Sequence, residues 1–133
     1  MKLTSIALLA GLALFTTGQA SAQERMTEST KAERMHIDSV YKSAKEACDK
    51  LSGNTRDVCQ AQAKADMRVS EADLAAKQKG TPEARSEARK VRADAQYDVA
   101  KEKCEDHKGN AKEQCLSEAK AAAARAKADM KSS

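Results

Sequence analysis

The sequence predicts an all-α protein of two tandem antiparallel helical hairpins, with four long helices packed in a coiled-coil-like manner and a disulfide stapling each hairpin. Three observations predict this fold. The chain contains an internal repeat with two cysteines in each copy, at an offset of 56 residues from Cys48 to Cys104. Glycine-containing breaks separate long stretches in which apolar residues recur three and four positions apart. No stretch shows the apolar–polar alternation that is typical of a half-buried strand.

The first 22 residues have the three parts of a secretory signal peptide. Lys2 supplies a positive charge, residues 6–15 form a short apolar run, and Ala20-Ser21-Ala22 ends the segment with small residues. We therefore expect cleavage between Ala22 and Gln23 and export to an oxidising compartment such as a bacterial periplasm. The apolar run is far shorter than the ~20 residues that a membrane-spanning helix needs, so we expect no membrane anchor after cleavage.

The composition limits both the partners and the core. The 24 basic and 20 acidic residues are mixed along the chain, as is typical of solvated helix faces. Nucleic-acid binding favours a basic stripe or stacking aromatic side chains, and the sequence has neither, so we expect no nucleic-acid partner. Alanine supplies much of the apolar fraction and buries little area, whereas ordering a residue costs ~1.5 kcal/mol. Crosslinks or partners are therefore expected to add stability to a marginal core.

The internal repeat aligns without a gap. The first copy reads Tyr41-x-x-Ala44-Lys45-Glu46-x-Cys48, then Gly53-Asn54, Cys59 and Ala63-Lys64-Ala65, and the second reads Tyr97-x-x-Ala100-Lys101-Glu102-x-Cys104, then Gly109-Asn110, Cys115 and Ala119-Lys120-Ala121. These identities at fixed spacing include all four cysteines, so a bias toward alanine and lysine does not account for them. We divide the chain into a signal peptide at 1–22 and hairpin repeats at 23–80 and 81–133.

The first hairpin is expected to join helices over residues 27–52 and 55–79. Gly53 suits the left-handed position that ends a helix, and Asn54 suits the N-cap that begins the next one. In both helices the apolar positions step by three and four, with Gln62 as an interruption in the second. The stripes are Ile37, Val40, Ala44, Ala47 and Leu51 in the first helix, and Val58, Ala65, Val69, Ala72 and Ala76 in the second.

The second hairpin is expected to join helices over residues 82–108 and 111–131. The break before it, Gly80-Thr81-Pro82, provides a glycine to end the preceding helix, a capping hydroxyl and a proline for the first helical position. Gly109 and Asn110 repeat the roles of the first Gly-Asn pair. The apolar stripes of these two helices are weaker than those of the first hairpin.

The four cysteines are expected to form the disulfides Cys48–Cys59 and Cys104–Cys115. Each pair flanks a Gly-Asn bend by about one helical turn, where antiparallel helices can bring the Cα atoms within the ~5.5–6 Å that a disulfide prefers. An even cysteine count in an exported chain is typical of disulfides. If both bends lie at one end of the molecule, all four thiols approach one another. Pairing across the repeats and a four-cysteine metal site near His107 are then alternatives, although zinc sites usually contain C-x2-C pairs.

No pattern in the sequence predicts catalysis. The chain has no Ser/His/Asp grouping and no phosphate-cradling glycine loop, so we expect a protein that is not an enzyme and needs neither a metal nor another cofactor. His36 and His107 are expected at the surface. Tyr41 and Tyr97 each precede a cysteine by two helical turns, and we interpret them as packing anchors, with a binding platform as the alternative.

The repeat motif Y-x2-A-K-x2-C-x4-G-N-x4-C-x3-A-K resembles a group of small exported proteins of proteobacteria. These proteins are rich in alanine and lysine and are sometimes labelled TolA-like. The resemblance covers Tyr41 to Lys64 and Tyr97 to Lys120. It implies a periplasmic helical protein, and it does not extend to the membrane anchor or the globular C-terminal domain of TolA.

These observations favour a non-enzymatic periplasmic protein that acts as an interaction or cell-envelope support module. Its partner would be an envelope protein or a second copy of the chain. A stress-protective or chaperone-like role is an alternative because the core is thin. A metal-handling role is a second alternative, and it depends on the four cysteines being free and close together.

Overall fold

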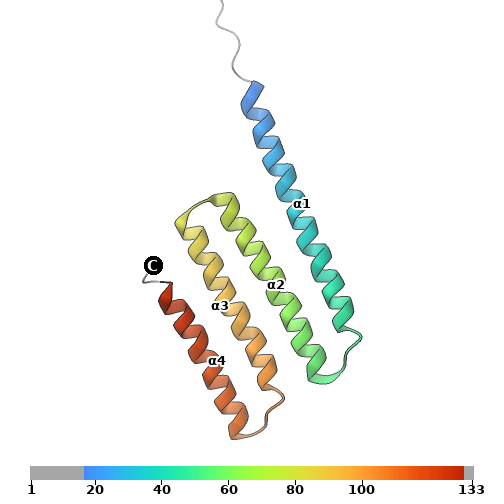
Figure 1. Ribbon diagram of the computed structural model, residues 1–133, viewed down its shortest axis with the longest axis vertical. Coiled ribbons are helices and arrows are strands. Elements are labelled where there is room, and N and C mark those ends of the chain that lie inside the picture. The colour runs from blue at the N-terminus through green and yellow to red at the C-terminus, as the bar shows by residue number, and fades with distance from the viewer. Residues whose placement is uncertain (1–16, 131–133) are drawn as a thin grey trace, which may run out of the picture.

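The computed structural model describes the backbone of residues 17–130 and the side chains of residues 27–130. Its four helices are α1 (Thr17–Cys48), α2 (Gly53–Lys79), α3 (Pro82–Cys104) and α4 (Asn110–Asp129). They run alternately up and down, and each packs only on its neighbours in sequence (Figure 1). The described part of the chain therefore forms a single layer of helices and not a closed bundle, and the predicted all-α fold of two hairpins is confirmed.

The predicted signal peptide falls largely outside this description. Residues 1–16 lie outside the described backbone, and the expected cleavage point after Ala22 lies within the first turns of α1, whose side chains are also not described. Along residues 17–130, none of the helices combines the length and the apolar character needed to cross a bilayer.

Both predicted disulfides are present. Cys48–Cys59 joins the end of α1 to α2 with a Cα–Cα distance of 5.5 Å, and Cys104–Cys115 joins the end of α3 to α4 with a distance of 5.6 Å. The two linked turns lie at the same end of the layer (Figure 1), as an up-down-up-down order requires. Each disulfide nevertheless links the two helices of one hairpin, and no disulfide joins the two repeats.

The break between the hairpins folds as the sequence predicts. Gly80 has a left-handed φ of 65° and its N–H donates to the carbonyl of Ala76, which closes the last turn of α2. Thr81 is the N-cap of α3, its hydroxyl accepting a hydrogen bond from the Ala84 N–H at 3.1 Å, and Pro82 occupies the first helical position. The N-cap satisfies one of the backbone donors that the start of a helix leaves without a partner.

Replacing this cap tests how much it stabilises the central turn. We expect Thr81→Ala to lower the free energy of unfolding by about 1 kcal/mol because the Ala84 N–H loses its acceptor. Urea titration followed by circular dichroism would measure the change. Thr81→Ser keeps the hydroxyl and is the matched control; a loss in Thr81→Ser as large as in Thr81→Ala would contradict the capping role.

The two Gly-Asn bends differ from the sequence prediction. Helices α1 and α3 end at Cys48 and Cys104, four residues before the predicted ends at 52 and 108, because a reversal between antiparallel helices needs several non-helical residues. Gly53 and Gly109 do have positive φ values, of 57° and 54°. They lie at the start of the following helix, however, and do not end the preceding one.

The predicted capping role of the two asparagines is wrong. No side-chain capping bond is made at the start of α2 or of α4. Instead, the Asn54 side-chain Nδ2 donates to the backbone carbonyl of Glu102 at 3.0 Å. Since Glu102 lies near the end of α3, this hydrogen bond ties the first bend to the second hairpin. Asn110 is exposed.

The contact face of α1 also differs from the predicted stripe. From Ile37 to Cys48, the buried or half-buried positions are Ile37, Tyr41, Ala44 and Cys48, whereas Val40 is 52% exposed. Ala47 and Leu51 are exposed as well, and Leu51 lies beyond the helix. The disulfide explains the difference: Cys48 is only 1% exposed and must face α2, which sets the rotation of α1 and brings Tyr41 and Ala44 to the contact.

The largest helix contact lies between α2 and α3, and its core is small. Ala65, Ala95 and Val99 form the buried cluster, with Ala61 and Val69 packed against it. Alanine lets two helices approach closely but contributes little burial per contact. Helix α4 contains no buried residue at all among those described, so its attachment depends strongly on Cys104–Cys115.

Candidate functional site: a charged groove across three helices

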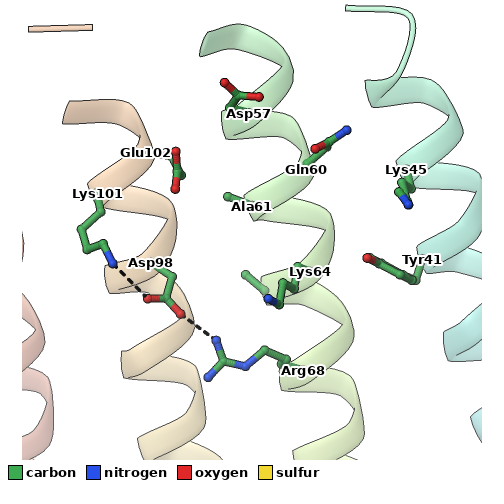
Figure 2. Close-up of a pocket in the computed structure, with 11 residues that line it drawn as sticks. Tyr41, Lys45, Asp57, Gln60, Ala61, Lys64, Arg68, Asp98, Lys101 and Glu102 are labelled. Atoms are coloured by element: carbon green, nitrogen blue, oxygen red, sulfur yellow. Dashed lines mark hydrogen bonds and ion pairs between the residues drawn. The ribbon is translucent and has the colours of Figure 1, made fainter. Parts of the chain in front are cut away.

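A hollow in the described surface forms a groove that runs across α1, α2 and α3 on one face of the layer (Figure 2), and we call it the charged groove. Its volume is about 540 Å³. Its polar lining is Tyr41 and Lys45 from α1, Asp57, Gln60, Lys64 and Arg68 from α2, and Asp98, Lys101 and Glu102 from α3. Ala61 and Ala65 complete the lining, and these small side chains leave the space open.

Ion pairs order the side of the groove formed by α2 and α3. Arg68 Nη1 lies 2.7 Å from Asp98 Oδ2, across the α2–α3 contact. Lys101 Nζ lies 3.9 Å from Asp98 Oδ1 and 5.4 Å from the centre of the Tyr97 ring. Figure 2 shows Lys101, Asp98 and Arg68 as a continuous chain of charges. These partly exposed pairs position the side chains more than they stabilise the fold, since exposed ion pairs contribute about 0–1 kcal/mol each.

Two lysines of the groove have no acidic partner among the described side chains. Lys45 projects from α1 and Lys64 from α2, and neither takes part in any of the ion pairs of the structure. Tyr41 lies half-buried on α1 beside them. Two ammonium groups and one phenol on a stapled hairpin are suited to bind a carboxylate or another anion by charge-assisted hydrogen bonds.

All three of these groove residues belong to the repeat motif. Tyr41, Lys45 and Lys64 of the first copy correspond to Tyr97, Lys101 and Lys120 of the second. The second copy does not form the same groove within one chain, because Lys101 is engaged with Asp98 and no further helix packs on α4 among the described residues. The tyrosines thus do more than pack between helices, since Tyr41 lines the groove and Tyr97 lies under the Lys101 ammonium group.

The residues singled out from the sequence lie elsewhere. The four cysteines are all in disulfides and have no free thiol, so a thiol-based metal site would require both disulfides to be reduced. Gly53, Asn54, Gly109 and Asn110 lie at the two bends. Both histidines are exposed, as predicted. In the part of the chain with described side chains, no three His, Cys, Asp or Glu residues gather as metal ligands would.

Sequence reasoning missed Arg68 and Asp98. These residues are 30 positions apart, and only the packing of α2 on α3 brings them together. Neither belongs to a local motif, so no signal in the sequence pointed to them. Lys45 and Lys64 were visible in the repeat, but their shared location on one face depended on the rotation of α1, which the predicted stripe had misplaced.

Comparison with known proteins adds no assignment. No protein-family model, no curated protein and no solved structure matches the chain. The predicted resemblance to small exported proteins rich in alanine and lysine stays a prediction.

Proposed function

We propose that this chain is a non-enzymatic interaction module of the bacterial periplasm, and that its charged groove binds an acidic segment of a cell-envelope protein. The observation that carries the proposal is the pair Lys45 and Lys64, two cations that line one groove and have no acidic partner among the described side chains. An acidic segment would supply the missing carboxylates. Tyr41 would add a planar surface and a hydroxyl beside them.

The two disulfides of the layer favour a role in binding at its surface. Each hairpin is held by a disulfide, so the part of the groove between α1 and α2 is braced before any partner arrives and needs little ordering on binding. The compartment is supported independently: the two disulfides are consistent with an oxidising environment outside the cytoplasm, and the sequence predicts an export signal.

The expected affinity is modest and sensitive to salt. Lys45 and Lys64 are exposed, and salt at physiological ionic strength largely screens interactions between exposed charges more than ~8 Å apart. Binding through such contacts is suited to a partner held at high local concentration, as in an envelope support structure.

Photocrosslinking in intact cells tests the proposal. A photoreactive residue in place of Gln60, inside the groove, is expected to crosslink to a defined envelope protein. Lys45→Glu with Lys64→Glu should abolish that crosslink because the groove then repels an acidic segment.

The matched control is Lys103→Glu. Lys103 lines a separate groove on the other side of the α2–α3 contact, so this variant should keep the crosslink at full strength. Absence of any defined partner, or equal loss in the control and in the groove variant, would contradict the proposal.

A further inference from the structure

The internal repeat relates the two outer helices of the layer, α1 and α4, to the two helices that form its central contact, α3 and α2. Helix α4 corresponds to α2 and α1 corresponds to α3, at the offset of 56 residues. Helices α2 and α3 pack on each other, whereas the outer sides of α1 and α4 meet no other described helix. We propose that the outer side of α4 in one copy packs on the outer side of α1 in a second copy, in the register of the α2–α3 contact. This contact goes beyond the proposed function, because it uses the two outer sides of the layer and not the charged groove.

The central contact supplies the template. Its apolar part is the cluster of Ala65, Ala95 and Val99. Its polar part includes the hydrogen bond from Asn54 Nδ2 to the Glu102 carbonyl, at 3.0 Å. This bond joins the two repeats at the end of the layer where both bends lie, and it fixes how far one hairpin slides along the next.

The donor of that hydrogen bond recurs on α4. Asn110 is the repeat equivalent of Asn54, and it is exposed, with its side chain making no capping bond at the start of α4. The acceptor recurs on α1, where Glu46 is the equivalent of Glu102.

The carbonyl of Glu46 is available to such a donor. The last four carbonyls of an α-helix lack partners within the helix, and three of them in α1 are satisfied by the following turn. The carbonyl of Lys45 accepts from the Asp49 N–H, that of Ala47 from Lys50, and that of Cys48 from Leu51. Of these four carbonyls, only that of Glu46 accepts no backbone hydrogen bond from the turn within the described residues. Donor and acceptor therefore lie on opposite edges of the layer, in the register that the central contact uses.

The surfaces around this pair are small enough for close packing. The outer side of α1 carries the repeat equivalents of the α3 residues that face α2. The outer side of α4 carries the repeat equivalents of the α2 residues that face α3. We call these rows the α1 edge (Ala32, Met35, Ser39 and Ser43) and the α4 edge (Ser117, Ala121, Ala124 and Ala128). All eight residues are exposed. Met35 is 64% exposed, the highest value among the exposed large hydrophobic residues, and corresponds to the half-buried Val91.

The edges are more polar than the central contact, so their association is expected to be weaker. Ser39 and Ser43 replace Ala95 and Val99, and Arg125 replaces Val69. The ion pair of Arg68 with Asp98 has no equivalent, because Ala124 and Lys42 stand in its places, and Lys42 and Arg125 bring two cations to the contact. An interface of this kind is suited to reversible contacts at high local concentration.

Such a contact is head-to-tail and does not close on itself. Head-to-tail contacts generate open chains when the rotation between copies does not close a ring, and here the open chain is a ribbon to which each copy adds four helices. Tyr97, Lys101 and Lys120 of one copy would then lie beside α1 of the next. The ribbon would thereby place a third helix beside the second copy of the motif, although Lys101 stays paired with Asp98.

Sedimentation velocity of the mature chain with intact disulfides tests the proposal, over ~10 µM to ~1 mM, where weak interfaces associate. The sedimentation coefficient is expected to rise with concentration. Met35→Lys blocks the α1 edge and Ala121→Lys blocks the α4 edge, so each variant alone should stay monomeric. An equimolar mixture of the two should form a dimer, because one variant keeps the α4 edge and the other keeps the α1 edge.

Three further variants test the register. Asn110→Asp removes the donor and should weaken association about fivefold, the effect of a hydrogen bond worth about 1 kcal/mol. Val40→Lys and Ala122→Lys are exposed controls outside the two edges and should associate like the unchanged chain. A chain that stays monomeric throughout, or a mixture of blocked variants that fails to dimerise, overturns the proposal. If the Gln60 crosslink to an envelope protein survives in that case, only the self-association is wrong and the proposed function stands.

Discussion

Removing either disulfide is expected to lower the free energy of unfolding by about 3 kcal/mol, the loop-closure entropy of a crosslink of this span. The loss is large because the buried core consists mainly of alanine, and native domains are stable by only about 5–15 kcal/mol. The relevant variants are Cys48→Ser with Cys59→Ser, and Cys104→Ser with Cys115→Ser. Removing both disulfides is expected to abolish cooperative unfolding.

The second disulfide is expected to have the more local effect. Helix α4 contains no buried residue, so without Cys104–Cys115 it should separate from α3 and lose its helical structure. Circular dichroism of the Cys104→Ser, Cys115→Ser variant should then show a loss of helix corresponding to the 20 residues of α4. The first hairpin differs, because Ala63 and Leu74 are buried in α2.

Urea titration of each variant beside the unchanged chain would measure these effects. The unchanged chain treated with a reducing agent is the matched control, since it loses the same bonds without a substitution. A stability within 1 kcal/mol of the unchanged chain for both variants would contradict the account, because the alanine core would then suffice on its own.

Enlarging the core at Ala95 is expected to have the next largest effect. Ala95 is 1% exposed and lies in the cluster between α2 and α3. Ala95→Leu forces three more carbon atoms into this contact, and overpacking of a close-packed site typically costs about 1–3 kcal/mol. We expect a loss near the upper end of that range, because α2 and α3 must move apart and strain both the Arg68–Asp98 ion pair and the Asn54 hydrogen bond.

Ala47→Leu is the matched control for this prediction. The sequence predicts Ala47 in the buried stripe of α1, but the structure places it in solvent. Its replacement should change stability by less than about 0.5 kcal/mol, as is usual for surface sites. Equal losses in Ala47→Leu and Ala95→Leu would show that α1 has the rotation predicted from the sequence and not the one in the structure.

The features that local chemistry determines were predictable. The repeat places Cys48 and Cys59 on either side of a bend, and an antiparallel hairpin is what allows them to pair. Gly80, Thr81 and Pro82 each have one strong conformational preference, and all three preferences agree on the same break. These features required no knowledge of how the hairpins pack on each other.

The features that depend on packing between helices were not predictable. The stripe of α1 was misplaced because Val40 and Leu51 are more apolar than Tyr41 and Cys48, although the disulfide outweighs that difference. Asn54 has a local role available as an N-cap, and it forms a longer-range hydrogen bond to Glu102 instead. The charged groove needs residues from three helices, so it emerges only from their arrangement in one layer.

Disulfide mapping would establish whether two separately stapled hairpins form this layer. Mass spectrometry of the unreduced mature protein, isolated from its native compartment, would identify each linked pair of peptides. We expect the linkages Cys48–Cys59 and Cys104–Cys115 and no other. Free thiols, or a bond between a cysteine of one repeat and a cysteine of the other, would contradict this expectation.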